Sequence, residues 1–589
     1  MKSNTRFFSM AALIVAVATL VGCTKENIGN GNGLTFTTTV EMPANGTKAL
    51  DANGHKTFAV GERIKVTCDG GSSTCTSEPL TSSDISADGK AAKFTFNFES
   101  TPTLTSGSTV TYEYPAAHSG LSGQDGTLAT LQSTYDYASC SPTVTETGSL
   151  PSNIQLQNQY AILKLFIKNS VDNDITESIT RLTVTNGTNT VIVNRSHAAG
   201  PIYVAMLPVT NGNISFTATD GPNNYVNYVK TVTGKTLDAG HLYPVTVSMD
   251  KQINLANLTS DYEAQDGDIL TGTLAGDCKI SVNTDGATVT LRNATITGTN
   301  NNSYPWAGIT CENNTTLVIK GTNNVTGFYA YYPGIQIASG KTLTIQGTGT
   351  LNASSNGYGA GIGGGYSGGG YSIVCGNIVI ESGTINATGG FWEAGIGGGA
   401  YANCGSITIK GGNVTATGGS GAAGIGTGLT PVDITGGDIS ITGGTVVATG
   451  GKGAAGIGSG FVTDYNILNK CGDISITGGQ VTATGGDGGN VYPDILNHSS
   501  WANYTCYGGA GIGTGSTPNN VEGSSSCGTI TIESGVTSVT ATKGGGTKPA
   551  TNCIGKNESI MNQGTCGTIT IGGTVYWDGI STSPYTYQP

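Results

Sequence analysis

The sequence predicts an all-β protein in which one or two β-sandwich domains precede a parallel β-helix of about nine coils. Residues 34–250 contain runs of alternating apolar and polar residues, separated by clusters of Gly, Asn, Asp and Pro. A Gly-Ile landmark then recurs from Ile309 to Ile554 at intervals of 26 to 55 residues. Gly makes up 93 of 589 residues and is interleaved with Ile, Val and Thr. This ordered interleaving favours packed β structure over a disordered Gly-rich tract.

The N-terminus has the organisation of an export signal. Lys2 and Arg6 precede an apolar segment that runs from residue 7 to residue 21, and this order is typical of a secretory signal peptide. The segment ends in Leu20-Val21-Gly22-Cys23, which resembles the bacterial lipobox. The resemblance implies cleavage before Cys23 and lipidation of its sulfur. The alternative is an ordinary secretory signal followed by a chance cysteine.

The residues after Cys23 predict where the chain is anchored. Thr24-Lys25-Glu26-Asn27 resembles the short surface-export signal of Bacteroidetes lipoproteins, in which Lys accompanies acidic residues. It implies a lipid anchor on the outer face of the cell outer membrane, where two or more acyl chains give stable attachment. No other stretch reaches about 18 apolar residues, so the sequence predicts no transmembrane helix.

Residues 34–250 predict antiparallel sheets packed as sandwiches. The run from Leu34 to Val40 is the first strand of this kind, and the run from Ala161 to Ile167 is a later one. Period-two alternation gives each strand one apolar face, which must be buried against a second sheet. Cys68 and Cys75 lie close together in the first sandwich, where they either form a local disulfide or stay as two thiols.

Short motifs in the same region carry a family resemblance. They are Thr47–Asp51, Phe58–Val66, Tyr114–Ala116, Ala161–Phe166 and Leu237–Tyr243. Together they resemble the fimbrillin family of Bacteroidetes, which are pilin-like surface proteins. The resemblance implies lipidation, cleavage in the first strand after a basic residue, and polymerisation with other fimbrial subunits by strand exchange. The basic residue here is Lys48, where many members have Arg, so an uncleaved lipid-anchored form is the alternative.

One repeating unit fills the second half of the chain. Its clearest copy runs from Cys404 to Gly419 and then through Ala423 to Gly428, and it returns from Gly436 and from Cys471. Repeats of 20–50 residues indicate stacked supersecondary units. Each copy holds three short β segments separated by Gly pairs and no helical segment, which predicts a parallel β-helix. We expect Ile, Val and Ala inside and Thr outside.

The sequence therefore divides into five predicted parts. They are a lipoprotein signal peptide at 1–22, a tether at 23–33, a first fimbrillin-like sandwich at 34–120, a second at 121–250 and a β-helix at 251–589. Every repeat array must cover the open ends of its apolar interior. We expect Tyr576 and Trp577, near the C-terminus, to cover the last coil.

Five cysteines take one position in the repeat, each followed by Gly: Cys375, Cys404, Cys471, Cys527 and Cys566. Equivalent positions on successive coils stack in a column. Two interpretations stay open, namely a column of small buried apolar side chains or disulfides between neighbouring coils. Gly436 interrupts the column and argues against regular pairing. The chain has no tight Cys-x-x-Cys pair and only five His, so we predict no metal site.

The composition argues against several functions. A net charge of −12 with 26 Lys and Arg argues against a nucleic-acid partner, which needs clustered basic residues. Gly-rich strings such as Gly359–Gly365 are followed by no predicted helix, so we interpret them as corners rather than nucleotide sites. Arg292 is the last Arg, and the acidic residues after it are scattered. Glycoside hydrolysis needs two carboxylates about 5–10 Å apart. We therefore predict no catalytic residues, no cofactor and no enzyme activity.

Aromatic residues in the coil-to-coil loops provide the functional prediction. They are Tyr366, Tyr371, Trp392, Tyr401, Trp501, Tyr504 and Tyr507. Rings beside Asn and Thr suit stacking on sugars, because they offer a flat apolar face next to hydrogen-bonding groups. Loops also tolerate insertions and carry function. The alternative is that these rings only cover loops and coil ends. The repeat style resembles carbohydrate-binding β-helix domains of bacterial surface proteins.

The predicted function is that of a fimbrillin-like surface lipoprotein, which acts as an adhesin or carbohydrate-binding protein. The sandwiches would form a stalk, and the β-helix would display loops to a glycan or a host surface. One alternative is a structural or accessory fimbrial subunit with the β-helix as a spacer. Another alternative is a polysaccharide-degrading enzyme.

Overall fold

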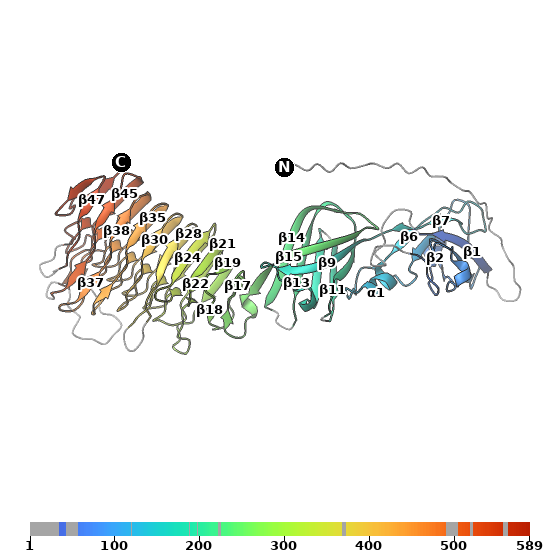
Figure 1. Cartoon of the computed structure of the whole chain (residues 1–589), viewed down its shortest axis with the longest axis horizontal. Coiled ribbons are helices and arrows are strands. Elements are labelled where there is room, and N and C mark those ends of the chain that lie inside the picture. The colour runs from blue at the N-terminus through green and yellow to red at the C-terminus, as the bar shows by residue number, and fades with distance from the viewer. Residues whose placement is uncertain are drawn as a thin grey trace. The chain divides into compact units, whose positions relative to one another are not determined.

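The computed structural model describes residues 34–42, 57–118, 120–187, 189–196, 198–221, 225–367, 373–490, 505–518, 522–557 and 564–589. The predicted signal peptide, Cys23, the tether and Lys48 lie outside these ranges. Almost all regular structure is β-strand, which confirms the predicted all-β fold (Figure 1). No described helix has the length and apolar character needed to span a membrane.

The helical elements of the described residues are short: η1 (Asp69–Gly71), η2 (Ser82–Asp84), the consecutive α1 (Leu128–Thr130) and η3 (Leu131–Tyr135), η4 (Thr176–Ser178) and η5 (Leu255–Asn257).

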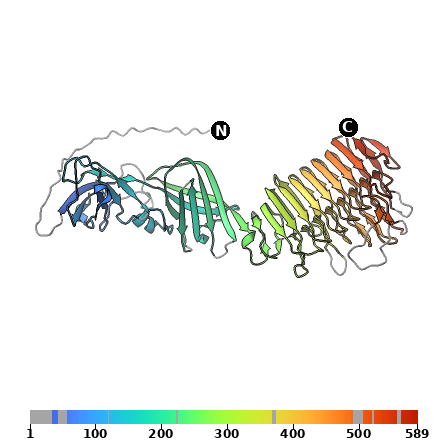
Figure 2. The same ribbon diagram turned by 180° about the vertical axis from the view of Figure 1, so that it is seen from behind.

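The chain forms two compact units. Unit 1 consists of Met1–Lys168, Asp174–Ala218 and Lys230–Ser248. Unit 2 consists of Asn169–Asn173, Thr219–Val229 and Met249–Pro589, and it contains the β-helix. Strands of unit 1 are blue to green in Figures 1 and 2, and the coils of unit 2 run from green to red.

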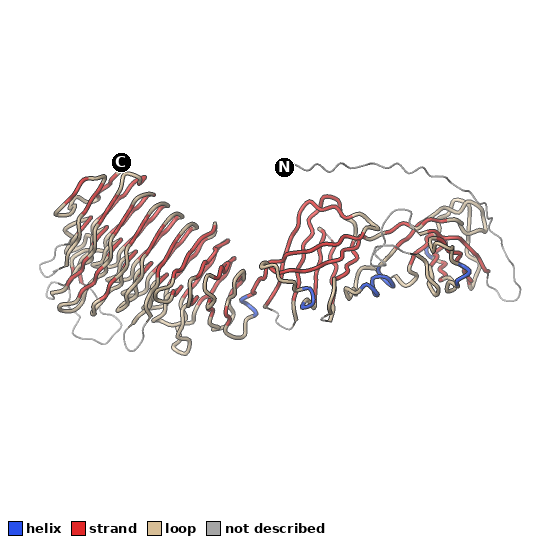
Figure 3. The backbone as a smooth tube through the Cα atoms, in the orientation of Figure 1, coloured by secondary structure: helices blue, strands red, loops and turns tan. Residues whose placement is uncertain are grey.

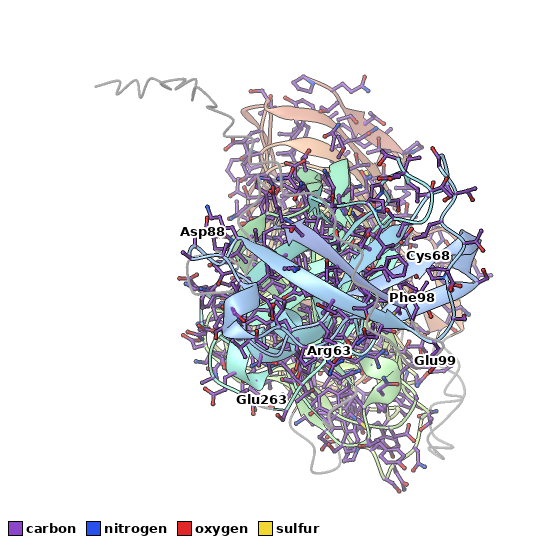
Figure 4. The ribbon with its side chains drawn as sticks, turned by 90° about the vertical axis from the view of Figure 1, so that its right-hand side faces the viewer. Arg63, Cys68, Asp88, Phe98, Glu99 and Glu263 are labelled. Atoms are coloured by element: carbon purple, nitrogen blue, oxygen red, sulfur yellow. The ribbon has the colours of Figure 1, made fainter. Side chains whose placement is uncertain are left out.

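Two small sheets build the first domain of unit 1. In one sheet β1 (Leu34–Glu41) pairs antiparallel with β4 (Ala91–Phe98) and parallel with β7 (Ile154–Gln155). The other sheet has the order β3 (Ser73–Thr76), β2 (Lys65–Cys68), β5 (Thr111–Tyr114), β6 (Ala138–Cys140) and β8 (Gln157–Asn158). Burial alternates along β4, so that Phe94, Phe96 and Phe98 point into the core while Lys93 and Asn97 point outward. Figure 4 labels Phe98 at this end of the chain.

The first domain extends beyond the predicted boundary at residue 120. Its apolar core includes Ala138, Val144, Leu150 and Leu156 together with the Phe residues of β4. Strands β6 to β8 complete its sheets, yet each has only two or three residues. Such short strands carry too few alternating positions to be recognised from sequence periodicity. For this reason the boundary predicted at residue 120 comes before the end of the first domain.

The sequence left open whether Cys68 and Cys75 form a disulfide or stay as two thiols, and both are thiols in the structure. The antiparallel register of β2 and β3 pairs Cys75 with Val66, and Cys68 with Ser73. The two cysteines are therefore diagonal neighbours, whose Cα atoms lie about 7–8 Å apart in an antiparallel pair. This separation exceeds the range of about 4.4–6.8 Å that a disulfide spans. Cys68 is labelled in Figure 4.

The second domain contains longer antiparallel strands. They are β9 (Ala161–Asn169), β10 (Arg181–Asn186), β11 (Asn189–Asn194), β12 (Ile202–Met206), β13 (Val209–Thr219), β14 (Val226–Leu237) and β15 (Leu242–Asn254). Strand β10 pairs antiparallel with β11, and β9 pairs antiparallel with β12. In β9 the buried residues Leu163, Leu165 and Ile167 alternate with more exposed ones, as expected for a strand with one face in a core.

Unit 2 winds into three parallel sheets, which confirms the predicted β-helix. We call them the first, second and third β-helix sheets, in the order in which each coil visits them. The first sheet contains β17 (Ile269–Thr273), β19 (Ala287–Thr297), β21 (Thr315–Lys320), β24 (Thr342–Gly347), β27 (Asn377–Ile380), β30 (Ile407–Ile409), β34 (Ile439–Ile441), β38 (Ile474–Ile476), β44 (Ile530–Ile532) and β47 (Ile569–Ile571).

The second β-helix sheet begins with the latter half of β19. It continues with β22 (Thr322–Thr326), β25 (Thr350–Ser354), β28 (Thr384–Thr388), β31 (Asn413–Thr417), β35 (Thr445–Thr449), β39 (Gly479–Thr484) and β45 (Val536–Thr542). In β31 Val414 and Ala416 are buried, whereas Asn413, Thr415 and Thr417 are exposed. Apolar residues therefore fill the interior and Thr lines the outside of this sheet.

The third β-helix sheet has ten strands, against about nine coils predicted. They are β16 (Tyr262–Glu263), β18 (Ile280–Val282), β20 (Ile309–Cys311), β23 (Ile335–Ile337), β26 (Ile362–Gly363), β29 (Ile396–Gly397), β32 (Ile425–Gly426), β36 (Ile457–Gly458), β42 (Ile512–Gly513) and β46 (Ile554–Gly555). Its strands are short, and Figure 3 shows that loops concentrate along one side of the β-helix.

Two smaller sheets accompany the coils. One contains β33 (Ile434–Thr435), β37 (Leu468–Lys470) and β43 (Ser524–Ser526), and the other pairs β40 (Gly489–Asn490) with β41 (Thr505–Cys506).

Isoleucines stack in register through the interior of the β-helix. In the third sheet Ile396 pairs with Ile425, which in turn pairs with Ile457, and all three are fully buried. Burying one such side chain contributes about 1.5–3 kcal/mol relative to leaving it exposed. Because one coil buries only one side of each isoleucine, neighbouring coils must stack for the interior to form.

The last coil is closed by antiparallel strands rather than by an aromatic lid. β48 (Thr574–Tyr576) pairs with β47, and β49 (Tyr585–Tyr587) pairs with β45. They cover two strand edges that would otherwise expose unpaired backbone groups. The expectation that Trp577 covers the end is wrong, because 82% of its surface is exposed.

Candidate functional site

Aromatic side chains gather in the loops that enter and leave the third β-helix sheet. Equivalent loops of successive coils lie next to one another because the coils stack in register. The set that we call the aromatic cluster consists of Tyr331 before β23, Tyr358 and Tyr366 on either side of β26, and Phe391, Trp392 and Tyr401 on either side of β29.

The rings of the aromatic cluster contact one another across three coils. Tyr331 and Tyr366 stack with ring centroids 4.9 Å apart, and Tyr366 meets Tyr401 edge-on at 5.0 Å. Tyr358 links this row to the next coil, since its ring lies 5.3 Å from that of Trp392 and 6.0 Å from that of Phe391. These separations fall in the favourable range for aromatic pairs, so the cluster is one continuous set of contacts.

The cluster has an exposed layer and a supporting layer. Phe391 exposes 50% of its surface, and Tyr331, Tyr366 and Tyr401 are partly exposed. Trp392 is only 8% exposed and packs against the buried ring of Tyr358. The sequence predicted that Trp392 offers a stacking face, but in the structure its ring supports the exposed layer instead.

Phe391 and Tyr331 belong to the aromatic cluster but were not among the residues predicted from the sequence. Phe391 directly precedes Trp392, and Tyr331 lies just before the Gly334-Ile335 landmark, at a loop position that resembles that of Tyr358. A comparison of aromatic residues at equivalent loop positions of the repeat would have found both. Which of two adjacent aromatic residues is exposed depends on the loop backbone, and periodicity does not specify that backbone.

The backbone is strained at two members of the cluster. Trp392 has φ 69° and Tyr401 has φ 64°, which is the left-handed region that bulky side chains rarely adopt. Such conformations cost about 1–3 kcal/mol each and concentrate at binding and catalytic sites. These two loop conformations therefore destabilise the folded state. Their retention points to a role for the aromatic cluster beyond packing.

A buried carboxyl group lies beneath the aromatic cluster. Glu393 is completely buried, and its Oε2 accepts a hydrogen bond from the backbone N–H of Ala400. Its Oε1 has no hydrogen-bond partner among the described residues. Burial raises the pKa of Glu393 well above its ordinary value, because a charged carboxylate is poorly solvated there. The folded protein therefore favours the neutral acid.

Tyr358, Tyr366 and Tyr401 are neutral hydrogen-bonding groups at physiological pH, because the pKa of each is raised. Burial raises the pKa of Tyr358 to about 12. Burial also raises the pKa of Tyr401, and the neighbouring Tyr366 and Glu393 act in the same direction. Their hydroxyls therefore remain protonated and stay available as donors and acceptors.

Tyr507, the other predicted aromatic residue that the structure describes, is not part of the aromatic cluster. Tyr507 is partly buried, and Lys548 Nζ lies over its ring, 5.5 Å from the centroid. Tyr371, Trp501 and Tyr504 lie outside the described residues.

Acidic residues of the β-helix have structural contacts. Asp438 Oδ1 accepts a hydrogen bond from the N–H of Asp473, and Asp473 Oδ1 accepts one from Thr529. Each of these carboxylates thus caps the backbone of the next coil. Glu381 forms an exposed ion pair with Lys410 at 3.0 Å. Within the described ranges, no group of three or more His, Cys, Asp or Glu side chains is arranged to hold a metal ion.

Comparison with known proteins identifies the repeat. A family model described as a beta helix repeat matches residues 343–366, 378–400, 407–429 and 439–461. Each matched segment covers one coil, from a strand of the first sheet to the loop after the third sheet. The match supports the parallel β-helix and includes four of the six residues of the aromatic cluster. No curated protein and no solved structure matches the chain, and the fimbrillin resemblance of residues 34–250 is not confirmed.

Proposed function

We propose that this β-helix repeat protein binds uncharged glycans at the cell surface through its aromatic cluster. The observation that carries the proposal is the contiguous row of partly exposed rings formed by Tyr331, Tyr366 and Tyr401, with Phe391 exposed beside it. Coils are about 4.8 Å apart, so a row across three coils is roughly 10 Å long. A surface of this length accommodates more than one sugar ring.

The chemistry of the cluster favours a neutral ligand. Aromatic faces contact the apolar C–H faces of sugars, and neutral hydroxyls exchange hydrogen bonds with sugar hydroxyls. Tyr366 and Tyr401 provide both kinds of group, because their rings are partly exposed and the pKa of each hydroxyl is raised. Glu393, a buried carboxyl beside these rings, favours its neutral form. The cluster therefore has little charge with which to attract an ionic substrate.

The proposal is for binding rather than turnover. Its cell-surface location rests on the lipobox-like sequence at Cys23 and on the polar residues that follow it. In this view, acyl chains on Cys23 hold the protein on the outer membrane, and residues 34–250 serve as a stalk. Whether the chain is also cut at Lys48 and assembles with fimbrial subunits is a separate prediction.

Replacing Phe391 by Ala is expected to weaken glycan binding roughly 10-fold, which corresponds to about 1.4 kcal/mol. The variant removes a half-exposed ring whose contact among the described aromatic rings is with Tyr358, so the fold should survive. The full chain is first screened on a glycan array, and the best neutral oligosaccharide is then titrated by calorimetry. Tyr366→Ala should weaken binding at least as much, since it removes a ring from the centre of the row.

Trp577→Ala is the matched control for this experiment. Trp577 is an aromatic residue of unit 2 that is 82% exposed and lies outside the cluster, so its loss should leave affinity unchanged. Equal weakening by Phe391→Ala and Trp577→Ala, or no binding of any glycan, would overturn the proposal. Release of reducing ends during incubation would instead support the polysaccharide-degrading alternative.

A further inference from the structure

We propose that Cys375 with Cys404, and Cys527 with Cys566, are two sites of disulfide formation that clamp neighbouring coils of the β-helix. Each pair joins consecutive strands of the cysteine column, and Cys471 remains a thiol. The proposal does not depend on glycan binding.

Backbone hydrogen bonds set the members of each pair side by side. The N–H of Cys375 donates to the carbonyl of Asn403, and the N–H of Gly405 donates to the carbonyl of Cys375. This pattern puts Cys375 directly opposite Cys404 in a parallel pair. Cys527 and Cys566 form a parallel bridge of the same kind. Adjacent parallel strands are about 4.8 Å apart, which lies within the Cα separation that a disulfide spans.

The sulfur atoms of each pair are already in contact. The Sγ–Sγ distance is 2.9 Å for Cys375 and Cys404, and it is also 2.9 Å for Cys527 and Cys566. Closing this gap to the bond length of about 2.05 Å requires movement of less than 1 Å, which small side-chain rotations supply. The strand pairing therefore does not have to change when the bond forms.

Gly436 divides the column for a steric reason. It lies opposite Cys404 on the next coil, and a Cβ atom added there would lie 2.7 Å from the Thr427 methyl group. Thr427 is held in place by a hydrogen bond from its hydroxyl to Asn469 Oδ1 at 2.6 Å. The position therefore excludes a cysteine, and the column separates into one pair and one group of three.

Within the group of three, the geometry selects one partner for Cys527. Cys471 also lies opposite Cys527, since its N–H donates to Ser526 and its carbonyl accepts from Gly528. However, the sulfur contact in this group joins Cys527 to Cys566, and the described structure has none between Cys471 and Cys527. Bridging Cys527 to Cys566 leaves Cys471 as a buried thiol beside Gly436.

Burial of Cys404 and Cys527 favours formation of the bridges while the coils close. The hydrogen bond to Cys375 and burial together raise the pKa of Cys404, and the corresponding contacts raise the pKa of Cys527. Because the thiolate is the reactive form, both residues react slowly once the fold is complete. We therefore place the oxidation before the neighbouring coils cover the sulfurs.

The oxidant is a disulfide, such as oxidised glutathione or a protein disulfide. One cysteine thiolate attacks the oxidant, which releases one thiol and leaves a mixed disulfide. The thiolate of the paired cysteine then displaces the second thiol and forms the Sγ–Sγ bond. The pair loses two protons and two electrons in total, and the oxidant is reduced to two thiols.

The full chain, refolded with oxidised glutathione, is alkylated with iodoacetamide and digested without reduction. Cleavage after both Lys and Glu separates the cysteines, because Glu381 lies between Cys375 and Cys404, and Lys543 lies between Cys527 and Cys566. Mass spectrometry should show two linked peptide pairs and an alkylated Cys471. Reduction should lower the Tm of the β-helix by roughly 5 °C per bridge.

Three variants test which cysteines of the column form the two bridges. Cys404→Ser and Cys566→Ser should each lose one linked pair and part of the effect of reduction on Tm. Cys471→Ser should keep both linked pairs and the whole effect. Complete alkylation of all five column cysteines, or a linked peptide joining Cys471 to Cys527, would overturn the proposal.

Discussion

Replacing Gly426 by Ala is expected to lower the free energy of unfolding of the β-helix by about 2–5 kcal/mol. Gly426 has φ 138°, and a Cβ atom added there would lie 1.9 Å from the carbonyl oxygen of Gly458 on the next coil. The substitution therefore adds backbone strain and a steric overlap with a rigid main chain. Gly458 stands in the same relation to Gly513, so the strand pairing of the third sheet depends on this repeated glycine.

Tryptophan fluorescence during denaturant unfolding isolates the effect on the β-helix. All four Trp residues of the chain occur between residues 306 and 577, which belong to unit 2. Gly286→Ala is the matched control, because Gly286 also has a positive φ of 75° but has no atom within 4 Å of the added Cβ. The control should lose only the backbone contribution of about 1–2 kcal/mol. Equal losses of unfolding free energy in both variants would show that the steric overlap with Gly458 adds nothing to the cost of the Gly426→Ala substitution.

Replacing Glu393 by Gln is expected to stabilise the β-helix, and the gain should grow as pH rises above about 4.5. The pKa of Glu393 is raised by burial, so the folded state holds a proton that the unfolded chain releases. Wild-type stability is therefore complete below the unfolded pKa and is lost as pH rises toward the folded pKa. The loss is about 1.4 kcal/mol for each pH unit in this window.

The Gln variant cannot ionise and keeps an oxygen that accepts from the N–H of Ala400. Unfolding free energies of both proteins are measured by fluorescence at several values between pH 4 and pH 8. Glu381→Gln is the control, because Glu381 is a surface carboxylate paired with Lys410, and such a pair contributes less than about 1 kcal/mol. A difference between wild type and Glu393→Gln that stays constant with pH would contradict the assignment of a neutral buried acid.

Gly426→Ala and Glu393→Gln both test the packing between neighbouring coils of the β-helix. Gly426 lies within β32 and lets that strand approach Gly458 of the next coil closely, and Glu393 is buried just before the neighbouring strand β29 of the same sheet. The loops with positive φ at Trp392 and Tyr401 carry the buried ring of Trp392 and the more exposed rings of Phe391 and Tyr401. Stability and the proposed binding surface are thus linked, because the loops that present the rings are held by the packing between coils.

The sequence by itself determined the repeat and its interior. Alternation assigned Val414 and Ala416 to the inside of a strand, and the Gly-Ile landmark located Ile396, Ile425 and Ile457 in one column. The cysteine column was predicted in the same way, and backbone hydrogen bonds in the structure place its members opposite one another. These features follow from sequence because strand periodicity is local and each coil repeats the pattern of the previous one.

Only the tertiary structure decided which side chains are exposed or within reach of a partner. It buried Trp392 and exposed Phe391, it separated Cys68 from Cys75 by register, and it brought Cys527 against Cys566. It also extended the first domain through strands too short to be recognised in the sequence. These outcomes have one physical reason. Each depends on loop backbone angles or on contacts between different segments of the chain, which a local residue pattern does not encode.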